Sequence, residues 1–315
     1  MDSGKQSRRA VLAAGVSGLA AGMIANGWTP ARAAAPEAAG QASGGQGDPL
    51  PPVLKVSIAA YSFRADLDEY PGKRGKMSLF DLADMAVRWR IDAIEPTSYY
   101  FLRDDDEYIY SLKAKIFRNG LDISGTPVRN NFCLPPGPEL KKEIETLKKW
   151  VDICVKLGSP AIRVFAGRPD PNRSREQIFK TLVDAMKEAA EYAQSRGIFL
   201  GLENHGFMTE TADDVLRIVD AVKNDWMAVN LDSGNFKTDG YAQIAKLAPR
   251  AVICQMKTLV STPDGKRVPV DVPRFMQILR DAKYRGYVAL EFEEKKDPHE
   301  EVPVWLKKMQ DAIRA

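Results

Sequence analysis

The sequence predicts a (β/α)8 barrel, the TIM-barrel architecture of the α/β class, over residues 53–315. Short apolar, β-rich segments alternate with amphipathic helical patterns, and this alternation divides the region into eight successive strand–helix units. Eight consecutive units of this kind close most economically as a barrel. An open doubly wound sheet is the alternative, but no Gly-x-Gly-x-x-Gly motif follows the first predicted strand.

The predicted strands are short runs of apolar and β-branched residues. In chain order they are Lys55–Ala60, Ile91–Glu95, Asp122–Gly125, Ala161–Phe165, Phe199–Glu203, Ala228–Asp232, Val252–Gln255 and Tyr287–Phe292. Helices with one apolar face are expected at Ser78–Trp89, Pro138–Leu157, Arg175–Ser195, Ala212–Val222, Val272–Tyr284 and Val302–Ile313. The segment Tyr99–Tyr110 holds four tyrosines and three consecutive aspartates, and it fits a lid, an interface or an exposed loop equally well.

The first 52 residues are predicted to precede the barrel. Arg8 and Arg9 are followed by an uncharged stretch rich in alanine and glycine and by an A-x-A cleavage site, which indicates a twin-arginine signal peptide over residues 1–33. The alternative is an uncleaved anchor, but several glycines and Asn26 make the stretch a poor membrane span. Residues 34–52 are typical of a flexible linker. A periplasmic or secreted protein, exported folded by the twin-arginine machinery and without a stable membrane span after cleavage, is therefore expected.

Charge and cysteine content exclude several classes of protein. Removing residues 1–33, which hold four basic and one acidic residue, leaves equal numbers of both kinds in the rest of the chain. Such a balance gives no electrostatic footprint for nucleic acid. Cys133, Cys154 and Cys254 are odd in number and widely spaced, so buried thiols are expected rather than disulfides or a Cys-x-x-Cys metal site.

Oxygen-bearing side chains stand at the ends of the last four predicted strands: Glu203, Asp232, Gln255 and Glu291. The C-terminal ends of barrel strands are where this architecture places its chemistry. Three carboxylates and one amide oxygen at one barrel mouth would form a site for a hard divalent cation. Without a cation the carboxylates would repel one another, although each of them alone could pair with an arginine or a lysine.

Further polar residues near the strand ends are candidates for binding a substrate. Lys257 shares the strand face of Gln255 and is expected to point into the mouth with it. Arg163 lies inside an apolar strand and needs an anionic partner; if that partner is Glu95, both residues are structural. Asn131 follows the third predicted strand, where a structural hydrogen bond is an equally good explanation.

The C-terminal half carries four motifs in the order of the strands: Leu202-Glu203-Asn204-His205-Gly206, Leu231-Asp232-Ser233-Gly234-Asn235-Phe236, Gln255-Met256-Lys257 and Gly286-Tyr287-Val288-Ala289-Leu290-Glu291. With them, residues 53–315 resemble the sugar phosphate isomerase/epimerase superfamily of xylose isomerase-like TIM barrels. The resemblance implies one bound divalent metal ion, Mn2+ before Mg2+ or Co2+, with the ligands Glu203, Asp232, Gln255 and Glu291. The chain departs from the family at Gln255, where most relatives have histidine, and at Asn235, where epimerases often have a substrate-binding histidine.

The resemblance also implies a reaction. The enzyme would isomerise or epimerise a free sugar by removing a proton next to the carbonyl, which forms a metal-stabilised enediolate. Glu203 and Glu291 would transfer the proton on the two faces of the substrate, and Lys257 would steady the developing oxyanion. The substrate-binding residues expected on this interpretation are Lys257, Arg163, Asn235 and Asn131.

Two other functions stay open. His205 directly follows a ligand motif and could act as the base on a 3-keto-glycoside, so that β-elimination expels the C1 substituent; alternatively it orients Glu203. A third hypothesis is a periplasmic sugar-binding barrel without turnover. The histidine-rich DNA-repair endonuclease branch of the superfamily is excluded, because the chain holds only His205 and His299. The sequence does not name the sugar, its stereocentre or the oligomeric state.

Overall fold

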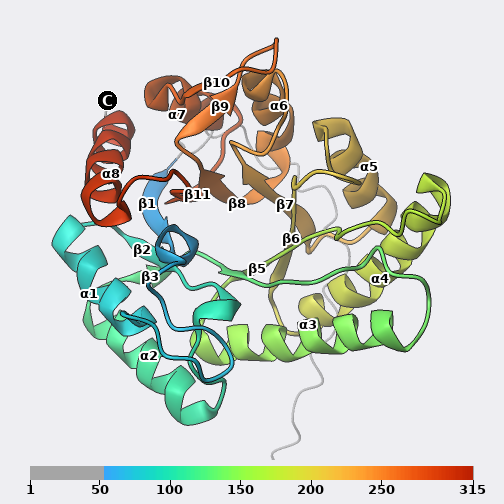
Figure 1. Cartoon of the computed structure of the whole chain (residues 1–315), viewed down its shortest axis with the longest axis horizontal. Coiled ribbons are helices and arrows are strands. Elements are labelled where there is room, and N and C mark those ends of the chain that lie inside the picture. The colour runs from blue at the N-terminus through green and yellow to red at the C-terminus, as the bar shows by residue number, and fades with distance from the viewer. Residues whose placement is uncertain (1–52, 315) are drawn as a thin grey trace, which may run out of the picture. The chain divides into compact units, whose positions relative to one another are not determined.

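The computed structural model describes residues 53–314, in which strands and helices alternate along the chain (Figure 1). The barrel strands are β1 (Leu54–Ala59), β2 (Ala93–Glu95), β3 (Asp122–Ile123), β4 (Thr126–Pro127), β5 (Ala161–Val164), β6 (Phe199–Glu203), β7 (Met227–Asp232), β8 (Ala251–Met256) and β11 (Gly286–Leu290). The helices are α1 (Leu79–Trp89), α2 (Asp106–Arg118), α3 (Pro138–Leu157), α4 (Arg175–Ser195), α5 (Ala212–Val222), α6 (Gly240–Leu247), α7 (Val272–Asp281) and α8 (Pro298–Arg314). Shorter elements are the hairpin of β9 (Leu259–Ser261) with β10 (Arg267–Pro269) and the 3-10 helices η1 (Ala60–Phe63), η2 (Ser98–Tyr100) and η3 (Ala248–Arg250).

Neighbouring barrel strands pair in parallel, in the order β3-β2-β1-β11-β8-β7-β6-β5-β4. Only Ser124 and Gly125 separate β3 from β4 in the chain, so the two ends of this order are one stretch of backbone and the barrel closes there. The predicted (β/α)8 barrel is confirmed. Its third strand is divided into β3, which pairs with β2, and β4, which pairs with β5.

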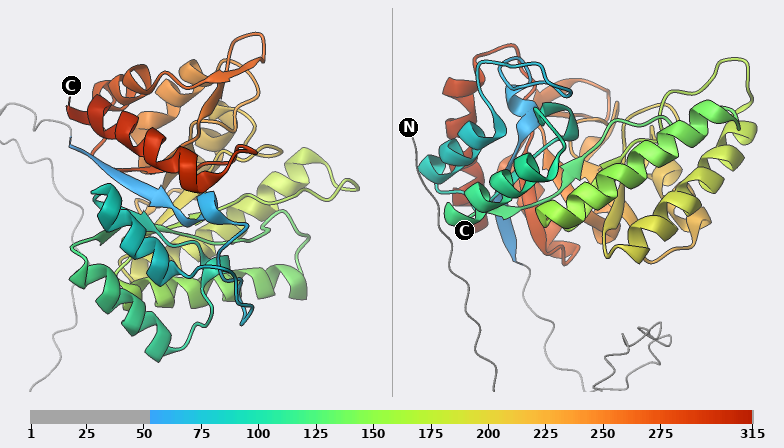
Figure 2. Two further views of the ribbon diagram at one scale, coloured as in Figure 1. Left: turned by 60° about the vertical axis from the view of Figure 1, so that its left-hand side comes forward. Right: turned by 90° about the horizontal axis from the view of Figure 1, so that it is seen from below.

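The helices form a ring outside the strands (Figure 1). In the turned views, β1 runs between α8 and the pair of α1 and α2 (Figure 2). Local sequence sets where several helices begin, because Ser78, Ser174 and Thr211 form capping boxes at α1, α4 and α5. Among residues 53–314, no helix is both long and apolar enough to cross a bilayer.

The eight predicted strands and six predicted helices are all present, with ends that differ by a few residues. The helices α2 and α6 belong to the two units for which no helix range was predicted. The segment Tyr99–Tyr110 divides between η2, a short connection and the first turns of α2, which Asp105 caps. The signal peptide and the linker predicted for residues 1–33 and 34–52 lie outside the described residues.

The strand β8 carries one extra residue, Val252, where it pairs with β7. Beyond this bulge Asn230 lies opposite Ile253, and Asp232 lies opposite Gln255. Residues opposite one another on neighbouring strands share a face of the sheet. The bulge therefore sets which β8 side chains enter the interior of the barrel together with those of β7.

Candidate functional site

Three of the predicted carboxylates lie at the C-terminal mouth of the barrel. Glu203 ends β6, Asp232 ends β7 and Glu291 follows β11, and their exposed fractions are 2%, 0% and 5%. Asn235 donates from Nδ2 to Glu203 Oε1 (2.9 Å) and accepts on Oδ1 from Lys257 Nζ (2.8 Å). We refer to Glu203, Asp232 and Glu291 as the carboxylate cluster.

The ammonium group of Lys257 lies within this cluster. Its Nζ is 3.3 Å from Asp232 Oδ2, 3.7 Å from Glu291 Oε2 and 2.8 Å from Glu293 Oε2. Burial alone would lower the pKa of Lys257, but the attraction of the surrounding carboxylates raises it well above its usual value. The cluster therefore holds a buried positive charge that belongs to the protein itself.

Arg163 supplies a second buried positive charge, on the β5 side of the mouth. Its Nε is 2.7 Å from Glu203 Oε2, so the anionic partner is Glu203 and not Glu95. Its remaining nitrogens donate to Val128 O (2.8 Å) and to the hydroxyl of Tyr99 (3.1 Å). These contacts satisfy the charge of an arginine that is 3% exposed.

The carboxylate cluster is poorly solvated. One oxygen of each member (Glu203 Oε2, Asp232 Oδ2 and Glu291 Oε2) is buried and receives no hydrogen bond; each faces a cationic nitrogen instead. Burial raises the pKa of Glu203, against the lowering effect of Arg163. Burial likewise raises the pKa of Glu291 well above its usual value, although Lys257 opposes the rise. Both glutamates are thus shifted toward the range in which a carboxyl group can give and take protons near neutral pH.

Gln255 lies in a separate hydrogen-bond chain with Glu95 and Asn230. Its Nε2 donates to Glu95 Oε1 (2.7 Å), and its Oε1 accepts from Asn230 Nδ2 (2.7 Å). Asn230 precedes Asp232 by two residues on β7, so Asn230 lies one layer deeper in the barrel, whereas Gln255 lies opposite Asp232. The amide oxygen predicted to bind a metal is thus engaged with Asn230.

An aromatic and basic wall flanks the cluster on the side of β1, β2 and β5. The rings of Tyr61 and Tyr99 meet edge to face at 6.4 Å between centroids, and the guanidinium of Arg129 lies 4.7 Å from the centre of the Tyr99 ring. The ring of Phe165 lies 4.5 Å from that of His205. Aromatic faces of this kind offer contact area to the apolar faces of a sugar ring.

Two predicted site residues have other surroundings. The ring of His205 is exposed at the mouth, and its backbone N–H donates to Thr209 Oγ1 (2.9 Å). The side-chain oxygen of Asn131 accepts from the backbone N–H of Cys133 (3.1 Å) within its own loop. Asn131 is therefore used by local structure, which is the alternative considered for it above.

Glu293, Asn230 and Tyr99 belong to the site but were not predicted as site residues. Glu293 shares the strand parity of Glu291, and Asn230 shares that of Asp232, so parity was the available signal for both. Tyr99 reaches Arg163 from η2, which is distant in sequence. No pattern near Tyr99 indicates that contact.

The donor chemistry of the cluster fits a hard divalent cation, because each carboxylate keeps one buried oxygen free of hydrogen bonds. The arrangement is not preformed. Within residues 53–314, no three histidine, cysteine, aspartate or glutamate side chains already form a group that could hold a metal ion. The ammonium of Lys257 lies close to both Asp232 and Glu291, and Gln255 is engaged with Asn230.

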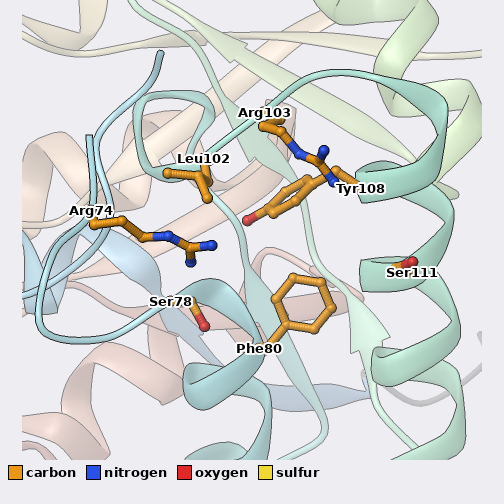
Figure 3. A pocket seen from close by; sticks show the side chains of 7 residues that line it. All are labelled: Arg74, Ser78, Phe80, Leu102, Arg103, Tyr108 and Ser111. Atoms are coloured by element: carbon orange, nitrogen blue, oxygen red, sulfur yellow. The ribbon is translucent and has the colours of Figure 1, made fainter. Parts of the chain in front are cut away.

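A separate cavity of about 520 Å³ lies between the first turns of α1 and α2 (Figure 3). Arg74 and Arg103 extend into it from opposite sides, and the hydroxyl of Tyr108 points toward Arg74 (Figure 3). Arg74 lies 3.6 Å from Asp68, and Arg103 pairs with acidic residues of its own loop and helix. Because both cations already have carboxylate partners, the cavity has no net attraction for an anion.

Known proteins of the same architecture resemble this chain. The family described as the xylose isomerase-like TIM barrel matches residues 83–309. D-psicose 3-epimerase from Clostridium cellulolyticum H10, in a crystal structure with D-tagatose, is 17% identical, with a TM-score of 0.63 over 82% of this chain and 97% of that one. 3-Keto-D-glucoside 4-epimerase from E. coli is 15% identical, with a TM-score of 0.63 over 82% and 99%.

A xylose isomerase-like TIM barrel protein from Mycobacterium smegmatis, solved in complex with magnesium, is 15% identical, with a TM-score of 0.60 over 82% of this chain and 95% of that one. Identities this low show a shared fold and nothing finer. A search of curated protein sequences finds no match. The family match, in contrast, spans more than half of the 315 residues. The chain therefore belongs to the xylose isomerase-like TIM barrel family.

Proposed function

We propose that the protein is a divalent-metal-dependent enzyme that isomerises or epimerises a free sugar by removing a proton next to its carbonyl group. The observation that carries the proposal is the pair of buried glutamates, Glu203 and Glu291, at one barrel mouth. Their strands are separated by β7 and β8, so the two carboxylates approach the mouth from different sides.

The residues divide the chemistry among them. One glutamate takes the proton from the carbon next to the carbonyl, and the electron pair left behind forms an enediolate. The other glutamate returns a proton to the neighbouring carbon or to the opposite face. Lys257 and Arg163 are buried cations beside the cluster, and they stabilise the negative charge that develops on the substrate oxygen.

The metal belongs to the same proposal. Glu203, Asp232 and Glu291 would hold it, and Gln255 would join them if its amide turned away from Asn230. When bound, a divalent cation would supply Lewis-acid polarisation of the carbonyl and hydroxyl oxygens. Oxygen donors without thiolate or imidazole favour Mn2+ or Mg2+, with Co2+ as a further candidate.

A neutral sugar is the substrate that these surroundings favour. Neither of the two buried cations needs a phosphate group as its partner, because Arg163 and Lys257 are both paired with carboxylates. The rings of Tyr61 and Tyr99 offer the apolar contact that a sugar face needs. Export directed by residues 1–33 is part of the proposal. Sugar phosphates are scarce outside the cytoplasm, so an exported enzyme would act on free sugars. Fractionation of cells that express the full chain tests this location.

The proposed reaction can be tested by hydrogen exchange. The purified protein, supplied with Mn2+, is incubated with free ketoses in D2O, and deuterium in recovered or converted sugar is measured by mass spectrometry. We expect exchange in the native protein and a loss of at least 100-fold in Glu291→Gln, because a positioned acid or base contributes about 10²–10⁴-fold. Asp232→Asn should lose Mn2+ content together with turnover.

The matched control is Glu294→Gln, a carboxylate on the same loop whose Oε1 accepts from Thr258 Oγ1 (3.1 Å). It should keep exchange close to that of the native protein. If the native protein exchanges no ketose with Mn2+, Mg2+ or Co2+, the isomerase proposal fails. Sugar binding without exchange would instead support the non-catalytic sugar-binding barrel.

A lyase acting on 3-keto-glycosides is the second candidate, and the exposed ring of His205 beside Phe165 favours it. His205 would take the proton from C2, and the released electron pair would form the C1–C2 double bond. The C1–O bond would then break, and the aglycone oxygen would leave with its electron pair and be protonated. Release of aglycone from a 3-keto-glycoside, without deuterium exchange into ketoses, would identify this reaction.

A further inference from the structure

The ammonium group of Lys257 lies among oxygens that belong to proposed metal ligands. Four oxygens surround Nζ: Glu293 Oε2 and Asn235 Oδ1 at 2.8 Å each, Asp232 Oδ2 at 3.3 Å and Glu291 Oε2 at 3.7 Å. The residue is only 7% exposed. The oxygens of Asp232 and Glu291 are among those that receive no hydrogen bond. Lys257 is thus the nearest positive charge to two of the three carboxylates proposed as metal ligands.

The path of the lysine side chain is fixed by the backbone beneath it. A Cβ atom at Gly234 would lie 2.7 Å from Lys257 Cβ and 2.8 Å from its Cδ, so the stem is pressed against the glycine. The backbone of Lys257 is also held in place, because its N–H donates to Ser233 Oγ (2.9 Å). The ammonium is therefore directed into the cluster by packing and by hydrogen bonding.

A metal ion and this ammonium group would compete for the same oxygens. A divalent ion of the Mg2+ type lies about 2.0–2.1 Å from its oxygen ligands. At Asp232 Oδ2 such an ion would lie within a few ångströms of Nζ, in a buried site where like charges repel strongly. The two cations therefore oppose each other's binding at these oxygens.

We infer that Lys257 and a divalent cation are alternative occupants of one carboxylate pocket, so that Lys257 sets the metal affinity of the protein. The inference rests on the proposed function only in taking Asp232 and Glu291 as metal ligands. Glu293, whose side chain is 37% exposed, gives the displaced ammonium a partner on the solvent side of the pocket.

The test compares metal affinity across variants of the full chain after chelator treatment. Lys257→Met keeps most of the stem and removes the charge, and isothermal titration with Mn2+ should show binding at least tenfold tighter than in the native protein. Lys257→Gln serves as a second neutral variant, and circular dichroism confirms that both fold. Lys266→Met is the matched control: Lys266 lies on the hairpin and pairs with Asp264 (2.9 Å), so its removal should leave Mn2+ affinity unchanged.

A double variant shows whether the tighter Mn2+ binding depends on the same carboxylates. Adding Glu291→Gln to Lys257→Met should remove the gain in affinity. If both neutral variants bind Mn2+ no tighter than the native protein, or if none of the proteins binds it, the inference is overturned.

The inference and the proposed function can fail separately. If the native protein exchanges deuterium into a ketose, but Lys257→Met binds Mn2+ no tighter than the native protein, the inference alone is overturned. Tighter Mn2+ binding without exchange into any ketose would overturn the isomerase proposal alone.

Discussion

Glu95 is an ionisable group buried beside the site. It is fully buried; one oxygen accepts from Gln255 Nε2, and the other receives no hydrogen bond. Burial raises its pKa to about 7, and the hydrogen bond from Gln255 and the charge of Arg163 only partly offset this effect. A carboxyl group in this position is held close to the boundary between its neutral and charged forms at neutral pH.

This shift predicts how stability depends on pH in the chelator-treated protein. A carboxyl group whose folded pKa is raised contributes stability that is complete below its unfolded pKa of about 4.5 and is lost as the pH rises through about 7. Glu95→Gln keeps an acceptor for Gln255 and removes the charge. It should therefore stabilise the fold relative to the native protein at pH 8, by an amount on the order of 3 kcal/mol, and much less at pH 5.

Chemical denaturation at both pH values measures this difference. Glu191→Gln, a substitution at an exposed position of α4, is the control and should change stability equally at both pH values. Equal effects of Glu95→Gln at pH 5 and pH 8 would contradict the assigned pKa.

At the residue scale, strand parity predicted which side chains face the mouth but not what they touch. Lys257 and Gln255 share a face, as parity requires, yet Lys257 reaches Asp232 while Gln255 bonds with Glu95 from a segment 160 residues away. A long flexible side chain and an amide that can turn either way are placed by neighbours that the local sequence does not reveal.

At the element scale, the helices that escaped prediction are those with weak or short patterns. α6 has only eight residues and starts after Asp239, which adopts a positive φ of 49° and gives no capping hydrogen bond. α2 begins within an aspartate-rich run that also suits a loop. The division of the third strand into β3 and β4 likewise depends on its two different neighbours and not on its own sequence.

The connection from β7 to α6 packs tightly against β8, and Gly234 is the point of contact. Gly234→Ala should destabilise the fold by about 1–3 kcal/mol, because its Cβ would meet Lys257 Cβ at 2.7 Å and Leu259 O at 3.0 Å. Gly125→Ala is the matched control, since its nearest contact is an ordinary 3.4 Å to Ile253 Cδ1. Thermal and urea unfolding measure both. A Gly234→Ala protein as stable as Gly125→Ala would show that the two segments separate easily.

At the scale of the whole molecule, the carboxylate cluster connects three strands of the closed barrel: β6, β7 and the end of β11. A cation held by all three would bind the folded chain and not the unfolded one. Mn2+ at about 100 times its dissociation constant should therefore add about 2.7 kcal/mol to the free energy of unfolding.

Thermal denaturation with and without Mn2+ measures this stabilisation. Asp232→Asn and Glu291→Gln should each abolish the shift in melting temperature, and a chelator should reverse it in the native protein. A shift of the same size in both variants would mean that the ion binds elsewhere on the chain.

The bulge at Val252 in β8 decides which β8 side chains face the lumen. If the same sequence paired with β7 without the bulge, Val252 would lie opposite Asn230 and Cys254 opposite Asp232, so that the thiol of Cys254 and the thioether of Met256 would stand where an amide and an ammonium now stand. Soft sulfur atoms would then face the carboxylate oxygens. The site would have neither the ammonium of Lys257 nor the hydrogen bonds of Gln255. The side chains that β8 contributes to the site at its C-terminal end thus depend on a bulge near its N-terminal end.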